Sequence, residues 1–402
     1  MFSQEQISEI VDLQTNDFVI KSTGIEREKL GSIPQLSSFA TIITGIRRCG
    51  KSTLLLQLLK KTDRNILYLN WEDIRLAGFE TNDFTRLYKV IIERKSKVLC
   101  FDEIQLVPNW EMFVHQLLRE DFHVLITGSN ASLLSVELGT HLTGRHLSIE
   151  LFPFSFAEFC TLKNMECNKE TLEMFMQTGG IPEYVKTGEE IILQNLINDI
   201  LMRDIVVRYG VRDIESLKRL TAYLLTNVAC PVSANNLSGH VGTKSATTIL
   251  EYFSYLKNAY LVDFVPHFSY SIKSQLRNPK KVYAIDLGLV NAVITGFSDN
   301  AGRKLENIVF LHLRVRYKEI FYYKEKVECD FIVKQNGQVT MAIQVCYQVN
   351  DENINREFNG LIDALKFFNL SEGLIVTFKQ EDEFEKEGKK IRLIPAYVYL
   401  QS

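Results

Sequence analysis

A glycine-containing turn between a short apolar run and a helix-like stretch carries the most specific chemistry in this chain. Residues 40–52 read ATIITGIRRCGKS, which fits the spacing G-x-x-x-x-G-K-S. Glycines let several backbone N–H groups point at one polyphosphate, and the next helix turns its positive dipole end toward the same anion. A lysine and a hydroxyl at these places reach the β- and γ-phosphates and Mg²⁺. We therefore predict a site for ATP and Mg²⁺. The residues expected to contact ATP are Gly45, Arg47, Arg48, Gly50, Lys51, Ser52 and Thr53.

A second candidate lies about fifty residues further along, where an apolar strand at 97–101 ends in two acids. These are Asp102 and Glu103. An acid that closes a buried strand beside a phosphate loop is the Walker B arrangement, so we expect Asp102 to bind Mg²⁺ together with Ser52. Glu103 is expected to polarise the attacking water, because neighbouring residues of a strand point to opposite sides. With Lys51, these acids would form one site at the carboxyl ends of parallel strands.

Two further side chains are candidates for sensing or stabilising the γ-phosphate. A strand at 123–127 ends in Gly-Ser-Asn, so we predict that Asn130 lies beside the phosphate from a neighbouring strand end. Arg145 stands between two core elements, where it would act as an arginine finger in its own site or in that of a neighbouring copy. The alternative for Arg145 is an ordinary surface or ion-paired arginine.

The order of the strands narrows the class of ATPase. An apolar run at 65–70, followed by a helix-like stretch at 83–94, separates the loop strand from the acidic strand. The acidic strand is therefore third along the chain, and 146–151 supplies a fifth. An extra strand in the middle of the sheet and a catalytic glutamate are typical of the branch that includes the AAA-type enzymes. Fold-level inference of this kind bears on the nucleotide chemistry and not on its purpose.

Composition sets outer bounds. A formal net charge of −3 argues against a uniformly basic nucleic-acid binder. Seven cysteines are scattered without a C-x-x-C pair, which favours a reducing cytoplasm and predicts neither disulfides nor a zinc site. The N-terminus lacks the basic-then-apolar order of a signal peptide, and no apolar run of 18 residues predicts a membrane span. We expect a cytoplasmic protein.

The pattern becomes helical after residue 155. Helices are expected at 155–160 and 169–177, a sharp turn at 179–184, and a long amphipathic helix at 191–209. This succession is similar to the helical lid that follows many AAA-type cores.

Residues 213–285 show three helix-like stretches and then two strands, which is the order of a winged helix. Between residues 214 and 281 the chain carries eight basic residues against three acidic ones. This local excess is compatible with contact to the phosphates of duplex DNA. Winged helices in ATPases also bind proteins, and the third helix carries only Lys244 near its start. DNA and protein partners both remain open at this point.

Several motifs together resemble a large group of bacterial and archaeal AAA-type ATPases that carry a C-terminal domain of unknown function with a nuclease-like core. The motifs are TGIRRCGKS at 44–52, FDEIQ at 101–105, TGSN at 127–130, LTGR at 142–145 and GGIPE at 179–183. The resemblance covers nearly the whole chain from about residue 18. It implies ATP binding and the order of the domains, and it leaves the biological role open.

The C-terminal region resembles the PD-(D/E)xK nuclease fold, whose carboxylates and lysine bind metal and position water. Glu306 and Asp330 match that pattern. Gln344 stands where a metal-binding carboxylate belongs, and a neutral amide is a poor ligand for a hard cation. Cys346 stands where the lysine belongs and cannot supply its fixed charge. The resemblance therefore implies a nuclease-like fold that does not cut.

We predict an α/β protein with a P-loop NTPase core of AAA-type parallel sheet at 1–165, a helical lid or linker at 166–212, a winged-helix domain at 213–290 and an α/β nuclease-like domain at 296–402. Two functions remain. One is an ATP-hydrolysing switch that acts on DNA or a protein partner, either alone or as a homo-oligomer. The other is a nucleotide-regulated DNA-binding or defence-type protein with little turnover. Glu103 favours the first, because a protein that only binds nucleotide has no need for it.

Overall fold

The computed structural model describes residues 1–402 except 35–38, 62–64, 130–144, 244 and 295–299. It divides into two compact units, Met1–Leu151 and Phe152–Ser402. The predicted core boundary at 165 lies beyond this division, because the helix at 156–163 belongs to the second unit.

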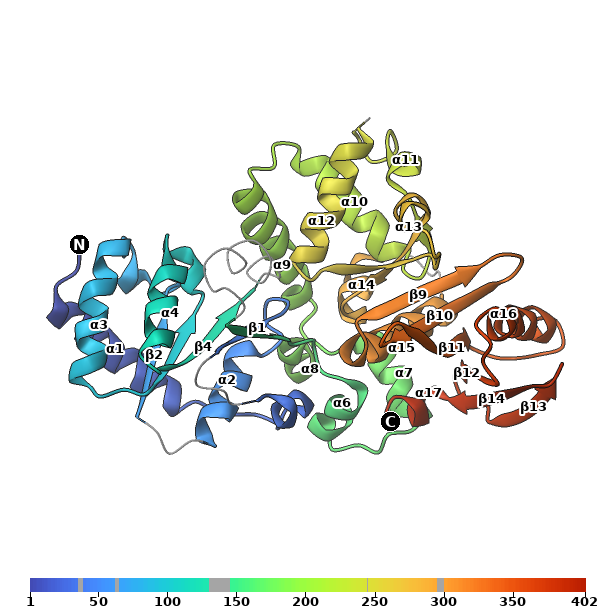
Figure 1. The fold of residues 1–402 in the computed structure, drawn as a ribbon, viewed down its shortest axis with the longest axis horizontal. Helices are drawn as coiled ribbons and strands as arrows, with labels where there is room; N and C mark the ends of the chain where they lie inside the picture. Colours follow the sequence, from blue (N-terminus) through green and yellow to red (C-terminus); the bar gives the residue numbers. More distant parts are fainter. Residues whose placement is uncertain (35–38, 62–64, 130–144, 244, 295–299) are drawn as a thin grey trace. The chain divides into compact units, whose positions relative to one another are not determined.

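The first unit is built on a sheet of five parallel strands in the order β2-β3-β4-β1-β5 (Figure 1). All five come from apolar runs, as expected for a parallel sheet covered on both faces. Strand β4 lies between the loop strand and the acidic strand, so the predicted extra strand is present. The strands are β1 (Ala40–Thr44), β2 (Ile66–Asn70), β3 (Val98–Asp102), β4 (His123–Gly128) and β5 (His146–Glu150).

Helices cover both faces of this sheet. The α-helices are α1 (Gln4–Val19), α2 (Lys51–Lys60), α3 (Phe84–Glu93) and α4 (Trp110–Arg119). Short 3₁₀ turns are η1 (Glu28–Ser32), η2 (Ile74–Leu76), η3 (Thr81–Asp83) and η4 (Ile104–Leu106). Because side chains alternate along a strand, Leu99 and Phe101 pack with α3 and α4, whereas Val98 and Cys100 pack with α2.

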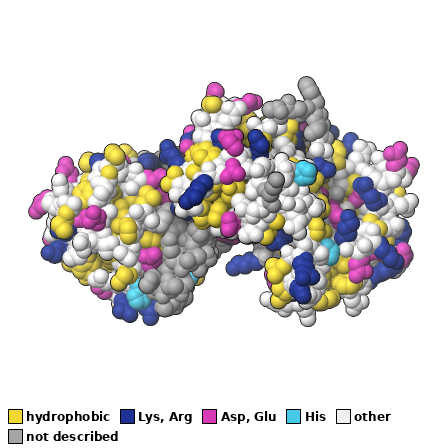
Figure 2. All heavy atoms as spheres, turned by 90° about the horizontal axis from the view of Figure 1, so that it is seen from above, with side chains coloured by type: hydrophobic (Ala, Val, Ile, Leu, Met, Phe, Trp, Pro, Cys, Tyr) yellow, Lys and Arg dark blue, Asp and Glu magenta, His cyan; other side chains and the backbone are white. Residues whose placement is uncertain are grey.

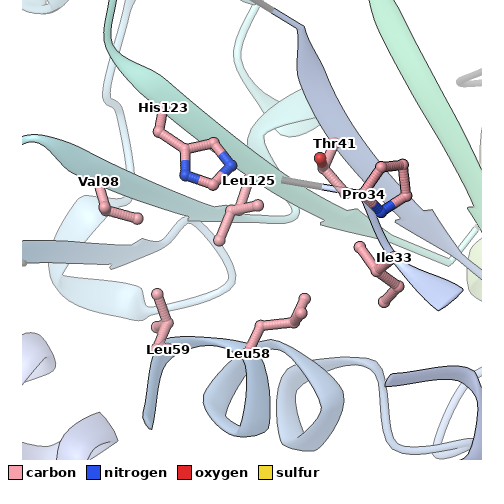
Figure 3. Close-up of a pocket in the computed structure, with 8 residues that line it drawn as sticks. All are labelled: Ile33, Pro34, Thr41, Leu58, Leu59, Val98, His123 and Leu125. Carbon is pink, nitrogen blue, oxygen red and sulfur yellow. The ribbon is translucent and has the colours of Figure 1, made fainter. Parts of the chain in front are cut away.

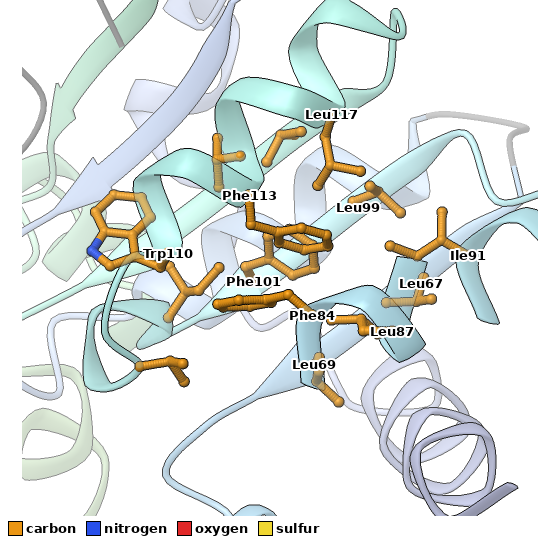
Figure 4. Packing of buried hydrophobic residues seen from close by; sticks show 14 of the residues in the cluster. Leu67, Leu69, Phe84, Leu87, Ile91, Leu99, Phe101, Trp110, Phe113 and Leu117 are labelled. Atoms are coloured by element: carbon orange, nitrogen blue, oxygen red, sulfur yellow. The ribbon is translucent and has the colours of Figure 1, made fainter. Parts of the chain in front are cut away.

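An aromatic cluster fixes the acidic strand from one side (Figure 4). The rings of Phe84 and Phe113 stack with centroids 4.4 Å apart, and Phe101 of β3 lies 5.4 Å from Trp71. Each buried ring contributes about 2 kcal/mol through removal of apolar area from water. The end of β3, which carries Asp102, is therefore held by a rigid core.

The second unit begins with helices. They are α6 (Phe156–Lys163), α7 (Lys169–Thr178), α8 (Pro182–Thr187) and α9 (Ile191–Asp199), which continues into a π-helical segment, η6 (Ile200–Val207). The long helix predicted at 191–209 is therefore helical throughout most of its length but changes its hydrogen-bond register after residue 199.

The GGIPE motif at 179–183 has a packing role in this unit. Gly179 has a φ of 73°, and a Cβ atom there would lie 2.3 Å from a carboxylate oxygen of Asp286. A Cβ atom on Gly180 would lie 2.3 Å from the carbonyl oxygen of Phe154. Asp286 in turn accepts the N–H of Gly180 at 2.6 Å. Both glycines are needed because backbone and a carboxylate approach them closely.

The described residues in the middle of this unit form four α-helices and a small antiparallel sheet in the order β6-β8-β7. Its elements are α10 (Ile214–Thr226), β6 (Pro231–Val232), α11 (Ala234–Leu237), α12 (Ala246–Asn258), β7 (Val262–Pro266), α13 (Ile272–Arg277) and β8 (Lys280–Ala284). The predicted order of helices and strands is present, with β6 and α13 as additions.

The end of the unit is a mixed six-stranded sheet in the order β13-β14-β12-β11-β10-β9 (Figure 1). Helix α16 packs against β10, β11 and β12, and its apolar face joins the core of this sheet. The elements are α14 (Leu287–Val293), α15 (Ala301–Arg316), β9 (Glu319–Lys324), β10 (Glu328–Gln335), β11 (Gln338–Cys346), α16 (Ile354–Phe367), β12 (Glu372–Thr377), β13 (Asp382–Lys386), β14 (Lys389–Pro395) and α17 (Ala396–Tyr399). No helix in the described part of the chain is both long enough and apolar enough to cross a membrane.

Candidate nucleotide site

Two glycines shape the loop between β1 and α2. Gly50 has a φ of 98° and precedes the first residue of α2. Gly45 has a φ of 155°, and a Cβ atom there would lie 2.1 Å from the carbonyl oxygen of Leu151. The loop therefore passes too close to the chain after β5 for any side chain at position 45.

Lys51 points back into this loop. It is only 8% exposed, and its Nζ donates to the carbonyl oxygens of Gly45 at 3.0 Å and Ile46 at 3.1 Å. The first N–H groups of α2 lack partners within the helix and add the positive end of the helix dipole. An ammonium and N–H groups at one place form a donor set that fits a polyphosphate.

Ser52 and Asp102 meet although they are far apart in the sequence. The Ser52 hydroxyl donates to Oδ2 of Asp102 at 2.9 Å. The same carboxylate accepts the hydroxyl of Tyr68 at 2.9 Å and the hydroxyl of Thr127. A carboxylate and a hydroxyl are oxygen ligands of the kind that Mg²⁺ prefers, so this donor set fits the predicted cation.

Glu103 follows Asp102 in a left-handed backbone conformation, with a φ of 55°. Its N–H donates to the carbonyl oxygen of Thr127 at 3.0 Å, which fixes the turn after β3. The side chain is 8% exposed and accepts a hydrogen bond from Gln105. Burial raises the pKa of Glu103 to about 7, against the opposing pull of the Lys51 ammonium. A carboxyl group with a pKa near neutrality is suited to accept a proton from water.

The two loop arginines are placed differently. Arg47 forms an ion pair with Glu72 at 3.2 Å and is about one-fifth exposed, whereas Arg48 is exposed at a φ of 63°. Thr53 lies half-buried in the first turn of α2. Contact of these three residues with the phosphates stays a prediction.

The structure argues against a role for Arg145 in its own phosphate site. The Arg145 carbonyl accepts the N–H of Ala40, the first residue of β1, and its side chain is exposed. Because β5 runs parallel to β1, Arg145 lies at the amino end of the sheet, one strand length or roughly 15 Å from the loop. Only action in a neighbouring copy remains as a prediction. Asn130, the predicted sensor, lies outside the described residues.

Three contacts escaped the sequence analysis. Tyr68 and Thr127 bind Asp102 from the two strands beside β3. Arg27, which is 4% exposed, donates to the carbonyl oxygen of Cys49 at 2.7 Å and so supports the loop from outside. The position of Thr127 at the end of a predicted strand could have indicated that it lies beside Asp102. No motif points to Arg27, because its partner is a backbone atom far along the chain.

A small cavity between α2 and the sheet is separate from this site (Figure 3). It lies toward the amino ends of the strands, and its walls are mostly apolar. The lining residues are Ile33, Pro34, Thr41, Leu58, Leu59, Val98, His123 and Leu125. An apolar lining at the opposite end of the strands is unsuited to phosphates.

The predicted residues of the C-terminal sheet also come together, with one unforeseen partner. Oxygens of Glu306 and Asp330 lie 2.9 and 2.8 Å from Nζ of Lys281, a residue of β8. Gln344 accepts the N–H of Asp330 at 3.2 Å. The Cys346 thiol donates to a backbone carbonyl, and burial raises its pKa to about 11. A neutral thiol does not replace a lysine, so the cation of this cluster is Lys281.

Three family models match successive parts of the chain. Residues 37–160 match the model of an AAA domain. Residues 169–301 and 301–399 match two domains of unknown function, DUF8612 and DUF4143.

Two curated relatives span nearly the whole chain. An uncharacterized protein of Methanocaldococcus jannaschii is 34% identical, over 96% of this chain and 92% of its own length. An uncharacterized protein of Haemophilus influenzae is 31% identical, over 88% of this chain and 93% of its own length.

Two solved structures are distant matches. One is a Signal Transduction ATPase with Numerous Domains protein with a tetratricopeptide repeat sensor from Pyrococcus horikoshii. It is 15% identical with a TM-score of 0.29, and the match covers 74% of this chain but 47% of that one. The other, Cdc6p from Pyrobaculum aerophilum, is 15% identical with a TM-score of 0.28, covering 73% of this chain and 93% of that one. Scores this low carry no argument.

The family follows from the near full-length relatives and the domain matches, which agree with the parallel sheet and its loop. This chain belongs to the AAA-type ATPases of archaea and bacteria that carry a C-terminal domain of unknown function.

Proposed function

We propose that this protein binds and hydrolyses ATP and that the nucleotide state controls what its second unit binds. The observation that carries the proposal is the meeting of Lys51, the Ser52–Asp102 pair and Glu103 at the carboxyl ends of β1 and β3. These groups come from separate parts of the sequence. A structural turn has no use for a buried lysine, a hydroxyl–carboxylate pair and a carboxyl group that titrates near neutrality in one place.

Each residue then has a definite task. Lys51 and the loop N–H groups hold the β- and γ-phosphates of ATP, and Ser52 and Asp102 hold Mg²⁺, which supplies neutralising charge when bound. Glu103 accepts the proton of the water that attacks the γ-phosphorus, while the bond to the β-phosphate oxygen breaks and ADP leaves. Tyr68 and Thr127 orient Asp102 through their hydroxyl groups.

For the second unit, we propose that residues 214–284 form a winged helix that binds a protein partner in preference to DNA. The solvent side of α12, the usual DNA reader, carries Leu250 and Glu251, and Lys257 is paired with Asp263 at 2.7 Å. Lys281 is buried among carboxylates. The basic excess seen in the sequence is therefore partly neutralised within the molecule.

The surface charge supports the same preference. On the face drawn in Figure 2, basic and acidic side chains are interspersed. Tracking a DNA backbone requires a stripe of one sign. The described cations of this region that remain for phosphate contact are Lys218, which is exposed beside Glu215, together with Arg219, Lys273, Arg277 and the half-buried Lys280.

Two substitutions test the ATPase proposal. Lys51→Ala should abolish ATP binding, because it removes the buried ammonium that lies against the loop carbonyls of Gly45 and Ile46. Glu103→Gln should retain ATP binding and lose hydrolysis by about 10² to 10⁴. Binding is measured with a fluorescent ATP analogue and turnover by phosphate release.

Matched controls are available on the same elements. Lys60→Ala changes an exposed lysine of α2, and Glu111→Gln changes an acid of α4, so both should behave as wild type. Equal turnover in Glu103→Gln and wild type would remove Glu103 from its role. Tight ATP binding without turnover in the wild type would favour the alternative of a nucleotide-regulated binding protein.

A further inference from the structure

A lysine is buried beside the acidic side chains of the C-terminal sheet. Lys281 lies in the apolar strand β8 and is 1% exposed. Lysine is almost never fully buried unless it is paired, because an unpaired ammonium loses its hydration without compensation. The function of this lysine is therefore to be sought in its partners.

Three carboxylates surround the ammonium. Nζ of Lys281 lies 2.9 Å from Glu306 of α15, and 2.8 Å from both Glu328 and Asp330 of β10. Burial opposes the charge of Lys281, yet Asp330 and Glu306 outweigh it and hold the pKa of Lys281 well above its ordinary value. The ammonium thus stays charged in the folded protein.

Each of these carboxylates has a second donor. Asp330 accepts the N–H of Val345 at 2.9 Å, Glu306 accepts the hydroxyl of Tyr283 at 2.7 Å, and Glu328 accepts Lys324 at 3.3 Å. At least one oxygen of each carboxylate that a metal ion would need is therefore hydrogen-bonded already. In the described part of the chain, no group of three His, Cys, Asp or Glu side chains is arranged to hold a metal.

Gln344, the neutral residue at the place of a carboxylate, also contributes to the balance of charge around Lys281. Gln344 accepts from the N–H of Asp330, and its Nε2 donates to Glu357 of α16 at 2.7 Å. Glutamate at this position would lose the donor and repel Glu357. The neighbouring cavity of about 290 Å³ is lined by Glu306, Val327, Glu328, Asp330, Gln344, Val345, Arg356 and Glu357. The Gln344 amide, the Lys281 ammonium and the Arg356 guanidinium, which forms an ion pair with Glu357, together satisfy its acids without a metal.

We propose that the Lys281 ammonium is a built-in cation that takes the place of a divalent ion in the nuclease-like cleft and fastens strand β8 to the C-terminal sheet. The C-terminal sheet then works without a metal ion, and removal of the ammonium opens a divalent-cation site between Glu306 and Asp330. This inference concerns the second unit alone and does not depend on ATP hydrolysis.

The test compares Mn²⁺ binding to full-length, nucleotide-free variants, measured by electron paramagnetic resonance and by the shift of the melting temperature. Lys281→Met should lower the Tm of the second unit by about 10 °C, since breaking a buried ion pair is strongly destabilising. Mn²⁺ should bind this variant and restore part of the loss. Lys281→Met/Asp330→Asn should bind no Mn²⁺ at this place, and Mn²⁺ should not raise its Tm.

A control and a rescue variant keep the experiment decisive. Lys324→Met removes an exposed lysine whose ammonium pairs with Glu328 at 3.3 Å and leaves Lys281 in place, so it should gain no Mn²⁺ site. If Lys281→Met does not fold, Lys281→Met/Glu328→Gln leaves one uncompensated charge fewer and should still bind Mn²⁺. Wild-type Mn²⁺ binding that disappears in Asp330→Asn would overturn the proposal. So would a folded Lys281→Met protein, alone or with Glu328→Gln, that ignores Mn²⁺.

Discussion

Replacing Glu103 by glutamine should stabilise the first unit, and the gain should depend on pH. Burial raises the pKa of Glu103 from its ordinary value of 4.5 to about 7. Because the folded pKa is the higher one, the contribution of this carboxyl to stability is fully present below pH 4.5 and is lost as the pH rises to 7. Glutamine is neutral and of similar shape, so it avoids that loss.

The size of the effect follows from the shift. With 1.36 kcal/mol per pKa unit, the cost of ionising Glu103 in the folded state is roughly 1 kcal/mol at pH 5 and roughly 3 kcal/mol at pH 8. Any pH-independent difference between the two side chains cancels when the two values are subtracted. The stability advantage of Glu103→Gln over wild type should therefore widen by about 2 kcal/mol between pH 5 and pH 8.

The chain offers a selective probe for this measurement. Its two tryptophans, Trp71 and Trp110, are both buried in the first unit. Urea denaturation of nucleotide-free protein, followed by tryptophan fluorescence, reports the unfolding of that unit at each pH. Glu111→Gln is the control, and its free energy of unfolding should differ from that of wild type by the same amount at every pH. The reasoning would be refuted if the difference in unfolding free energy between Glu103→Gln and wild type stayed constant or became smaller as the pH rises.

Three further predictions follow from the same geometry. The kcat/KM for Mg-ATP should rise about tenfold from pH 6 to pH 8, because Glu103 accepts a proton only when ionised; a wild-type profile as flat as the residual activity of Glu103→Gln would contradict this. Duplex DNA, if bound at all, should be retained only at low salt, with a slope of roughly −0.9 per neutralised phosphate; retention unaffected by Arg277→Ala at low salt would place any DNA site elsewhere. Incubation of DNA and RNA with Mg²⁺ or Mn²⁺ should give no cleavage, whereas cleavage that disappears in Asp330→Ala would show that Lys281 does not exclude the metal.

Local patterns in the sequence were sufficient for the loop and for the order of the elements. The motif at 45–52 is contiguous, so its chemistry depends on neighbours along the chain and on a backbone that glycine alone permits. Apolar runs of strand length predicted all five strands of the first sheet, because strands buried on both faces are apolar throughout. The acid at the end of the third run was therefore correctly placed next to Ser52.

Contacts between distant segments could not be predicted in this way. Arg145 ends the LTGR motif and precedes a strand, yet the parallel pairing of β5 with β1 puts it at the far end of the sheet. Tyr68 looked like one more apolar strand residue, and only the position of β2 beside β3 brings its hydroxyl to Asp102. Strand pairing is decided by the whole core, not by the residues of one strand.

The sequence by itself predicted an ATP site and determined that the nuclease pattern is incomplete, since both depend on which residue types are present at fixed spacings. Only the tertiary structure decided that Lys281 replaces the missing cation. In the sequence Lys281 counts as one of eight positive charges of a possible DNA-binding surface. In the folded protein Lys281 is buried among carboxylates and cannot contribute to such a surface. Its partners come from separate segments of the chain, so only the folded structure brings this ion pair together.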